Sequence, residues 1–273
     1  MKALKHYWPW GVMALALLAV LVGSLGLTQD PYYQDLLSRN LPPSPQHWFG
    51  TDSFGRDILA RVVAGTGMTL TVAVSATAIA LAGGAGLGLA GCIAGGAVRG
   101  VIYTGFDIIR TMPAILLSLA IMVALGAGVS SVILAVGIAY MPLFAYVSRA
   151  VYERETAAGY VAAARLIGAS PASIALRHIL PNAAGALLTQ LAIVVPRAIT
   201  TESVLSFFGL GVAPDVPTWG RILATAVDYA EQAPSSLLFP VLALSLTTLS
   251  LSVIGNRLRD RFDPLTRLQS SGT

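Results

Sequence analysis

Long apolar runs separated by short polar segments dominate the pattern of this sequence. Six of these runs approach the ~20 residues that a helix needs to cross the hydrocarbon core of a bilayer. They lie at 10–27, 68–96, 112–127, 131–148, 184–203 and 237–255. The second run is longer than one span requires, and the third is short, so its helix is expected to begin near Tyr103. The pattern predicts an all-α integral membrane protein with six transmembrane helices.

Composition points the same way and excludes several classes of protein. Of the 273 residues, 55% are hydrophobic and only 11% are charged, whereas soluble domains carry about 25% charged residues. Cys92 is the single cysteine, which excludes an intrachain disulfide and a thiol metal cluster. The longest outer segments, 28–66 and 204–236, are too short for a separate enzyme domain.

The distribution of Lys and Arg predicts the orientation, because cytoplasmic segments are enriched in these residues. With the N-terminus inside, the cytoplasmic segments hold Lys2, Lys5, Arg99, Arg110, Arg149, Arg154, Arg165, Arg177, Arg257, Arg259, Arg261 and Arg267. The outer segments hold Arg39, Arg56, Arg61, Arg197 and Arg221. We therefore expect both termini to be cytoplasmic.

The first apolar run has an alternative interpretation as a cleaved signal peptide, because Lys2, Lys5 and His6 form a basic start. Cleavage would leave five spans and place the two ends on opposite sides, against the charge distribution. We therefore divide the chain into an N-terminus with the first span (1–27), an extracytoplasmic segment (28–67), a five-span core (68–256) and a cytoplasmic tail (257–273).

The segment 160–181, between the fourth and fifth spans, has the local chemistry of a helical elbow. Its first helix ends near Gly168, which allows a left-handed backbone conformation. Ser170 and Pro171 are typical of an N-cap and the first position of a second helix, which Pro181 is expected to end. The elbow predicts a cytoplasmic docking surface for another protein, and the alternative is an interfacial loop without a partner.

The elbow resembles the cytoplasmic signature of ABC importer permeases, E-A-A-x-x-x-G followed after nine residues by I-x-L-P. In this chain the signature maps to Ala162, Ala163, Ala164, Gly168, Leu180 and Pro181, and we assign Ala169 and Ser170 of the turn to the same coupling surface. Ala162 replaces the acidic residue, and His178 replaces the isoleucine. The resemblance implies that these residues form the coupling helix, which sits in a cleft of the ATPase subunit.

Three further stretches resemble the C-type permeases of the dipeptide, oligopeptide and nickel importers. They are HWFGTDSFGRDILARVVAG at 47–65, ESVLSFFGLGVAPDVPTWGRIL at 202–223 and NRLRDRFDPLTR at 256–267. In the second stretch Phe208 replaces the leucine of the family pattern. Four motifs in the family's order extend the resemblance over nearly the whole chain.

The resemblance implies a type I ABC importer permease fold in the bacterial plasma (inner) membrane. The implied partners are a homologous B-type permease, two cytoplasmic ATPase subunits and an extracytoplasmic solute-binding protein. This chain would bind membrane lipid but no cofactor, metal or nucleic acid, and ATP and Mg would be bound by the ATPases. The implied mechanism is alternating access, with the elbow carrying the motion of the ATPases to the spans.

Charged residues of the first outer segment alternate in sign at Asp52, Arg56, Asp57 and Arg61. On a short amphipathic helix they would pair along one face. We expect either a solvated helix on the membrane surface, or a brace against the partner permease, or a contact for the binding protein. Phe207, Phe208 and Trp219 predict a lid-like segment at the outer mouth, and ordinary interfacial anchoring is the alternative.

Ionisable residues inside a membrane span are costly and commonly mark a transport path. Arg197 and Glu202 lie near the outer end of the fifth predicted span, where Gln190 and Thr201 add polarity. We expect these four residues to line the translocation path. The alternative is a pair of charged anchors at the level of the lipid headgroups.

Other motifs favour no competing chemistry. The stretch 86–91, GLGLAG, matches a dinucleotide fingerprint, but it lies in an apolar helix, where small residues allow close helix packing. A stand-alone channel or secondary transporter is the rival function, and a membrane-embedded enzyme is a weaker one, because the sequence shows neither midplane charges with inverted repeats nor a convergent catalytic set. Within the family, peptides and nickel or metal chelates remain equal alternatives as substrate.

Overall fold

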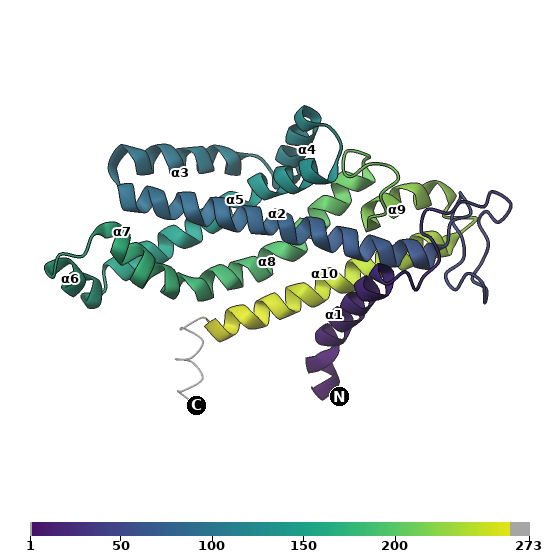
Figure 1. The fold of residues 1–273 in the computed structure, drawn as a ribbon, viewed down its shortest axis with the longest axis horizontal. Helices are drawn as coiled ribbons and strands as arrows, with labels where there is room; N and C mark the ends of the chain where they lie inside the picture. The colour runs from purple at the N-terminus through teal and green to yellow at the C-terminus, as the bar shows by residue number, and fades with distance from the viewer. Residues whose placement is uncertain (1, 263–273) are drawn as a thin grey trace.

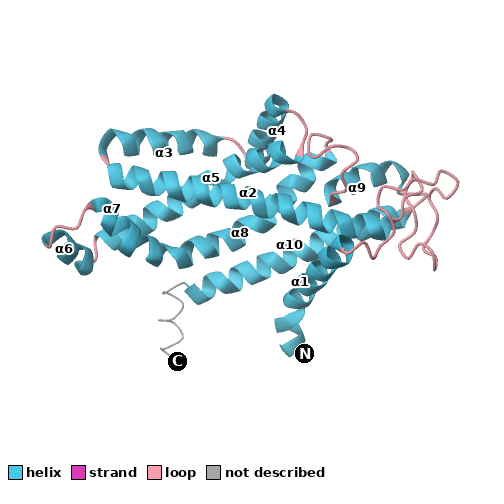
Figure 2. Ribbon diagram, in the orientation of Figure 1, coloured by secondary structure: helices cyan, strands magenta, loops and turns pink. Residues whose placement is uncertain are grey.

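The computed structural model describes residues 2–262 and is entirely helical apart from loops and one isolated bridge between Thr51 and Asp57 (Figures 1 and 2). The α-helices are α1 (Lys2–Ser24), α2 (Ile58–Ala94), α3 (Gly96–Thr111), α4 (Ala114–Leu125), α5 (Val129–Thr156), α6 (Gly159–Leu166), α7 (Pro171–Ile174), α8 (Leu180–Phe207), α9 (Trp219–Ala226) and α10 (Pro234–Phe262). Short π-helical and 3-10 turns cover Ala175–Ile179 and Val227–Tyr229.

Five helical stretches of the described residues are long and apolar enough to cross a membrane, and the bent pair α3–α4 raises the number to six. The pair bends by 98° at Met112 and Pro113. Pro113 lacks a backbone N–H, and the residue before a proline is driven out of the helical region, as the ψ of 139° at Met112 shows. The predicted short third span is therefore the second helix of a bent pair that begins at Gly96.

The central contact of the fold is the packing of α2 against α5 (Figure 1). Small residues make the close approach possible: a Cβ atom on Gly88 would lie 2.8 Å from Cα of Ala145. Gly91 faces Ile102 of α3, while Gly86 has open space around it. The packing interpretation of the GLGLAG stretch is confirmed at Gly88 and Gly91.

The fifth span starts earlier than the apolar pattern predicts. The stretch from Pro171 to Phe207 is continuous, because the π-helical turn at Ala175–Ile179 joins α7 directly to α8. Pro181 lies in the first turn of α8, so the prediction that it ends a helix is wrong. The wider π turn precedes the proline and absorbs the missing N–H and the bulk of its ring.

The two functional regions predicted from the sequence lie at opposite ends of the molecule. The elbow of α6 and α7 lies at one end of the helices, and the loops of residues 25–57 with α9 lie at the other (Figure 1).

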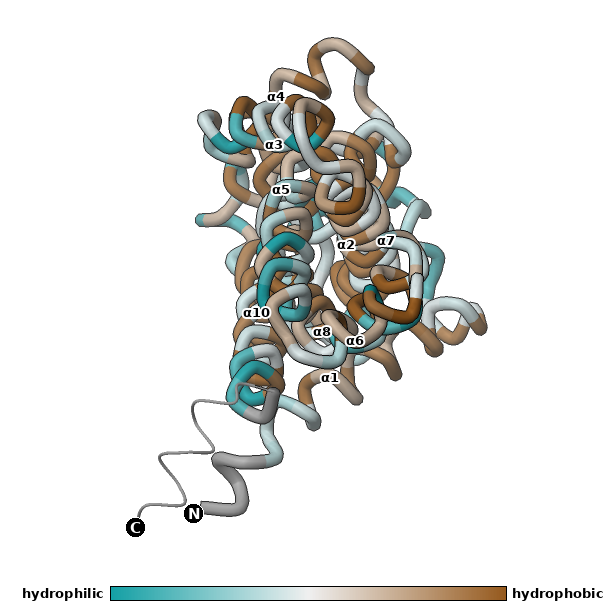
Figure 3. Tube along the Cα trace, turned by 90° about the vertical axis from the view of Figure 1, so that its left-hand side faces the viewer, coloured by the Kyte–Doolittle hydropathy of each residue, from teal (hydrophilic) through white to brown (hydrophobic). Residues whose placement is uncertain are grey.

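The second span begins at Ile58, inside the segment assigned to the outer loop, and α10 extends to Phe262. The rest of the predicted tail lies outside the described residues. Figure 3 shows the molecule from the elbow end, with hydrophilic residues along the C-terminal turns of α10.

Candidate functional site

The elbow between α6 and α7 is closed by local hydrogen bonds around Gly168. The Gly168 N–H donates to the Arg165 carbonyl at 3.0 Å, and the Ala169 N–H donates to the Ala164 carbonyl at 3.0 Å. Gly168 has a φ of +85°, so the pattern is a Schellman motif with glycine in the left-handed conformation. The Ser170 hydroxyl then caps α7 by accepting from the Ser173 N–H at 3.2 Å. The predicted turn chemistry is confirmed.

One face of the elbow packs against α5 and α8, and the other face is exposed. Val161 and Ile174 are buried and pack in the same apolar cluster as α5 and α8, together with Ala164. Ala162 and Ala163 point outward, so only two of the three predicted alanines form the small open face.

At the tip of the elbow, Leu166 and Ile167 are 89% and 87% exposed. Sequence reasoning missed this pair. The only signal was two consecutive large apolar residues directly before the turn glycine.

Side-chain hydrogen bonds tie the elbow to the helices on either side. The Tyr160 hydroxyl donates to the Glu155 carboxylate at 2.6 Å, and the Asn182 amide donates to the same carboxylate at 3.2 Å. The hydrogen bond between the Tyr160 hydroxyl and Glu155 raises the pKa of the Tyr160 phenol. Leu180 and Pro181 lie in α8 itself. These bonds join α6 to both α5 and α8.

At the opposite end, Asp52 organises two buried arginines. Its carboxylate accepts from Arg56 Nε at 2.7 Å and lies 3.6 Å from Arg61 Nε, and Arg61 is 1% exposed. Arg61 Nη1 also donates to the Pro31 carbonyl at 3.1 Å. Asp52 and Arg56 belong to a turn and Arg61 to the first turn of α2, so the predicted short amphipathic helix is wrong. The pairs are buried within the chain, because the outer loop folds over them.

Asp57 begins α2 and holds the outer loop in place. One carboxylate oxygen accepts from the Ala60 N–H at 2.7 Å as an N-cap, and the other lies 2.9 Å from Nδ1 of His47. His47 is therefore held by a carboxylate of the chain. The helix start and the loop are fixed by the same side chain.

Trp219 and Glu202 are core residues. Trp219 is 1% exposed, and its indole N–H donates to the Val62 carbonyl at 3.3 Å, so it does not anchor the chain at the membrane interface. Glu202 is 0% exposed, and its carboxylate accepts from the hydroxyls of Ser206 at 2.7 Å and Ser203 at 3.3 Å. Glu202 therefore neither pairs with Arg197 nor lines an open path.

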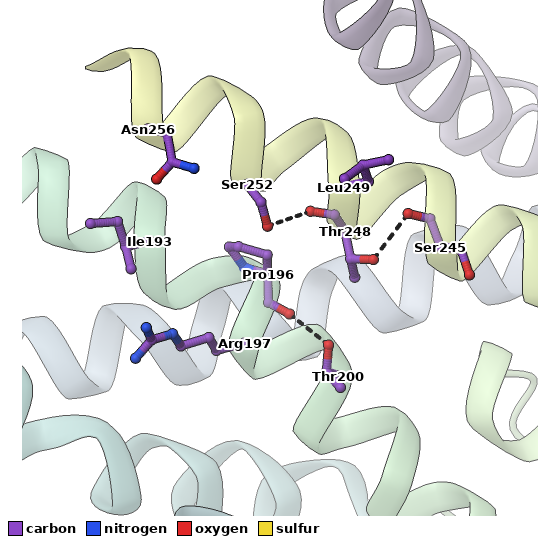
Figure 4. A pocket seen from close by; sticks show the side chains of 9 residues that line it. All are labelled: Ile193, Pro196, Arg197, Thr200, Ser245, Thr248, Leu249, Ser252 and Asn256. Atoms are coloured by element: carbon purple, nitrogen blue, oxygen red, sulfur yellow. Dashed lines mark hydrogen bonds between the residues drawn. The ribbon is translucent and has the colours of Figure 1, made fainter. Parts of the chain in front are cut away.

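The remaining predicted path residues divide into two groups. Thr201 is 2% exposed, and its hydroxyl bonds to that of Tyr140 at 2.9 Å. Arg197 lines an open cavity between α8 and α10 (Figure 4). Arg197 and Gln190 also line a second cavity, to which α5 contributes Val147 and Arg154. Arg197 lies within α8 rather than at its outer end, because the helix continues to Phe207.

The C-terminal end of α8 carries a pair of exposed aromatic side chains. Phe207 and Phe208 are 38% and 65% exposed, and their rings meet edge to face at 5.6 Å. Gly209 follows with a φ of +78°, and the Leu210 N–H donates to the Leu205 carbonyl at 3.0 Å. This turn ends the helix as the glycines and prolines of the segment predict.

Comparison with known proteins places the chain in a family. Residues 82–268 match the family described as binding-protein-dependent transport system inner membrane component. A peptide transport system permease of Brucella abortus is 37% identical over 268 residues, which cover 94% of this chain and 87% of that protein. The glutathione transport system permease GsiD of Shigella dysenteriae is 37% identical over 256 residues, covering 93% of this chain and 84% of that protein.

A solved structure of the MetNI methionine ABC transporter, in inward-facing conformations, has the same fold. Its TM-score is 0.61 at 17% identity, with 74% of this chain and 96% of that chain covered. The type I permease fold expected from the sequence is therefore confirmed. The chain belongs to the family of inner membrane components of binding-protein-dependent transport systems, and it is a non-catalytic, multi-pass permease subunit of an ABC importer.

Proposed function

We propose that this chain and a homologous B-type permease together form the path by which peptides enter a bacterial cell. Two ATPase subunits, which bind ATP and Mg, dock on the elbow, and a solute-binding protein delivers peptide at the opposite end. Both termini lie in the cytoplasm. The observation that carries the proposal is the open, preformed elbow bonded to α5 and α8, at the end opposite the large outer loops.

The elbow has the surface of a docking site for a protein. Ala162 and Ala163 allow close approach, and Leu166 and Ile167 present two large apolar side chains that nothing in the described chain covers. An exposed apolar patch on an extramembrane surface marks a site of interaction with another protein. The Schellman turn holds these side chains in one arrangement before docking, which lowers the entropy cost of binding.

The substrate class rests on the relatives. Those at 37% identity carry names for peptide and glutathione transport, and glutathione is itself a peptide. His47, the outer residue nearest in chemistry to a nickel ligand, is engaged by Asp57. We therefore favour peptides over nickel and metal chelates, the other class that the sequence left open.

The role of the outer residues follows from their burial. Asp52, Arg56, Asp57 and Arg61 brace the outer loop against α2 within this chain, so they act on a partner only through the loop that they hold. Phe207 and Phe208 are the exposed aromatic residues at the outer end of α8. We assign to them the contact with the binding protein or the partner permease.

Coupling requires that the ATPases bind the two states of the permease differently. Because α7 continues through the π turn into α8, movement of the elbow rotates or shifts the helix that carries Arg197 and Gln190. The ATPase cycle thereby changes the width of the groove between α8 and α10.

Uptake in cells tests the substrate class. Deleting the gene should abolish accumulation of a labelled dipeptide and leave that of labelled nickel, with and without chelator, unchanged. Restoring the gene on a plasmid is the control. Loss of nickel uptake alone would overturn the peptide assignment.

Co-purification tests the docking of the ATPases. Leu166→Glu and Ile167→Glu should reduce the amount of ATPase recovered with the tagged permease at least about tenfold, since a charge would be buried in the interface. Leu37→Glu is the matched control, because Leu37 is 97% exposed in the outer loop at the opposite end. Equal recovery from all three variants would contradict docking at the elbow. A permease that transports peptide without any ATPase would support the rival, a stand-alone transporter.

A further inference from the structure

A groove between α8 and α10 runs along the open side of the chain. It contains two adjoining cavities of about 640 Å³ and about 700 Å³. Both are lined by Ile193, Arg197 and Asn256. Cavities of this size match those that hold small molecules in proteins. Arg197, which Figure 4 shows in the first cavity, is therefore common to both.

The charges of the groove are of one sign. Its lining includes Arg154, Arg197 and Arg259 and no Asp or Glu among the described residues. Arg154 is neutralised by Glu155, which lies 2.8 Å away. The Arg197 guanidinium has no hydrogen-bond or ion-pair partner among residues 7–260, whose side chains the structure describes. The groove therefore attracts an anion.

Arg197 carries this charge deep in the membrane span. At about 1.5 Å per residue it lies about 15 Å from the end of α8 at Phe207, roughly half the thickness of the hydrocarbon core. A cation at that depth is costly unless it faces a watery cavity and meets an anion there. No carboxylate of residues 7–260 pairs with Arg197, and a substrate or a second protein can supply one.

Hydroxyls on both helices of the groove, Thr200 on α8 and Thr248 and Ser252 on α10, offer the complementary chemistry. Thr200 donates to the Pro196 carbonyl at 3.0 Å, Thr248 to the Leu244 carbonyl at 2.7 Å and Ser252 to the Thr248 carbonyl at 2.8 Å. Each hydroxyl proton is thus used within its own helix (Figure 4). The oxygen lone pairs remain free to accept from a ligand. The Arg197 guanidinium on α8 and the Thr248 and Ser252 hydroxyls on α10 thus line the same groove.

We propose that Arg197 binds the C-terminal carboxylate of a peptide in transit, while Thr248 and Ser252 accept hydrogen bonds from its amide or amino N–H groups. The inference rests on the proposed function. It assigns Arg197 as the residue of the permease that determines specificity for peptides. A guanidinium binds a carboxylate through two parallel hydrogen bonds, which suits a fixed orientation of the substrate. Free amino acids and peptides carry both kinds of group, whereas nickel ions carry neither.

The test compares two substrates in proteoliposomes that contain the whole transporter with its binding protein. One is a neutral labelled tripeptide with a free C-terminal carboxylate, and the other is the same tripeptide with a C-terminal amide. The ratio of their uptake rates is measured for the unmodified transporter and for Arg197→Gln and Arg197→Lys. Because the binding protein is unchanged, its own preference cancels when the ratios are compared.

Arg197→Gln should lower the carboxylate-to-amide ratio at least about tenfold, which is the expected loss for a charged hydrogen bond. Arg197→Lys should restore part of the ratio, since it keeps the charge but not the bidentate geometry. Arg110→Gln is the matched control, because it removes an exposed cation from α3, which packs on α2 and α5 away from the groove.

An unchanged ratio in Arg197→Gln would overturn the inference. An equal loss for both tripeptides would also overturn it, because Arg197 would then serve assembly, for example by pairing with an acid of the partner permease. Failure of the unmodified transporter to import either tripeptide would instead refute the proposed function.

Discussion

Substitutions at Gly168 distinguish two roles of this residue. It can be needed for the backbone conformation of the elbow, or for close contact with a protein that docks there. Gly168 adopts a φ of +85°, and a Cβ atom added there would meet no atom of the chain within 4 Å. Steric clash inside the permease therefore contributes nothing to the effect of a side chain. Two effects remain, which are the backbone strain of the left-handed conformation and the collision with whatever docks on the elbow.

The strain differs between side chains in a known order. Alanine in the left-handed region costs ~1–2 kcal/mol, whereas Asn and Asp visit this region more readily. A cost of ~1–2 kcal/mol lowers the population of the native turn roughly 5- to 30-fold relative to its alternatives. If only the backbone conformation of the turn matters, Gly168→Ala should reduce the recovery of ATPase most. Gly168→Asn should then recover nearly as much ATPase as the unmodified chain.

A close contact with the ATPase predicts a different order. Gly168→Asn and Gly168→Asp should then both lose ATPase, and Gly168→Asp should lose more, because its charge would be buried without a partner. We expect this second order of ATPase loss. The thermal stability of the isolated permease should be nearly unchanged in Gly168→Asn and Gly168→Asp and should fall in Gly168→Ala by no more than the strain of ~1–2 kcal/mol. The assay is recovery of ATPase with the tagged permease, followed by peptide uptake in proteoliposomes. Full recovery and uptake in Gly168→Asp would refute the coupling role of the elbow.

Three further substitutions test the packing of the chain. Trp219→Ala should lower the free energy of unfolding by about 3–5 kcal/mol, because it removes a buried indole, and thermal unfolding in detergent measures this. Asp52→Ala should cost about 3–5 kcal/mol, since it leaves two buried arginines without their carboxylate, and Asp52→Asn, which keeps the shape, should show that the loss follows the charge. Gly88→Leu should prevent folding by forcing α2 away from Ala145, whereas Gly86→Leu, placed in open space on the same helix, should fold normally. Equal yields of folded protein from the last two variants would contradict the packing of α2 on α5.

The sequence alone determined the features that depend on neighbouring residues and on the bilayer. Apolar runs long enough to span a membrane predicted the all-helical, multi-pass fold, because a chain in lipid must satisfy its backbone hydrogen bonds internally. Gly168 and Ser170 predicted the elbow correctly, since a left-handed stop and an N-cap are made by residues within one turn of each other.

Only the tertiary structure decided which polar side chains face a cavity and which are buried. Arg197 and Glu202 are close in sequence on one apolar helix, yet the first lines an open groove and the second is enclosed by hydroxyls. Hydrophobic periodicity separates such positions poorly when nearly every face of a helix is apolar, because lipid and protein core demand the same side chains. The pairing of Asp52 with Arg61 likewise depends on how the outer loop folds back on α2. Exposure and pairing are set by neighbours that are distant in the chain, and local patterns carry no information about them.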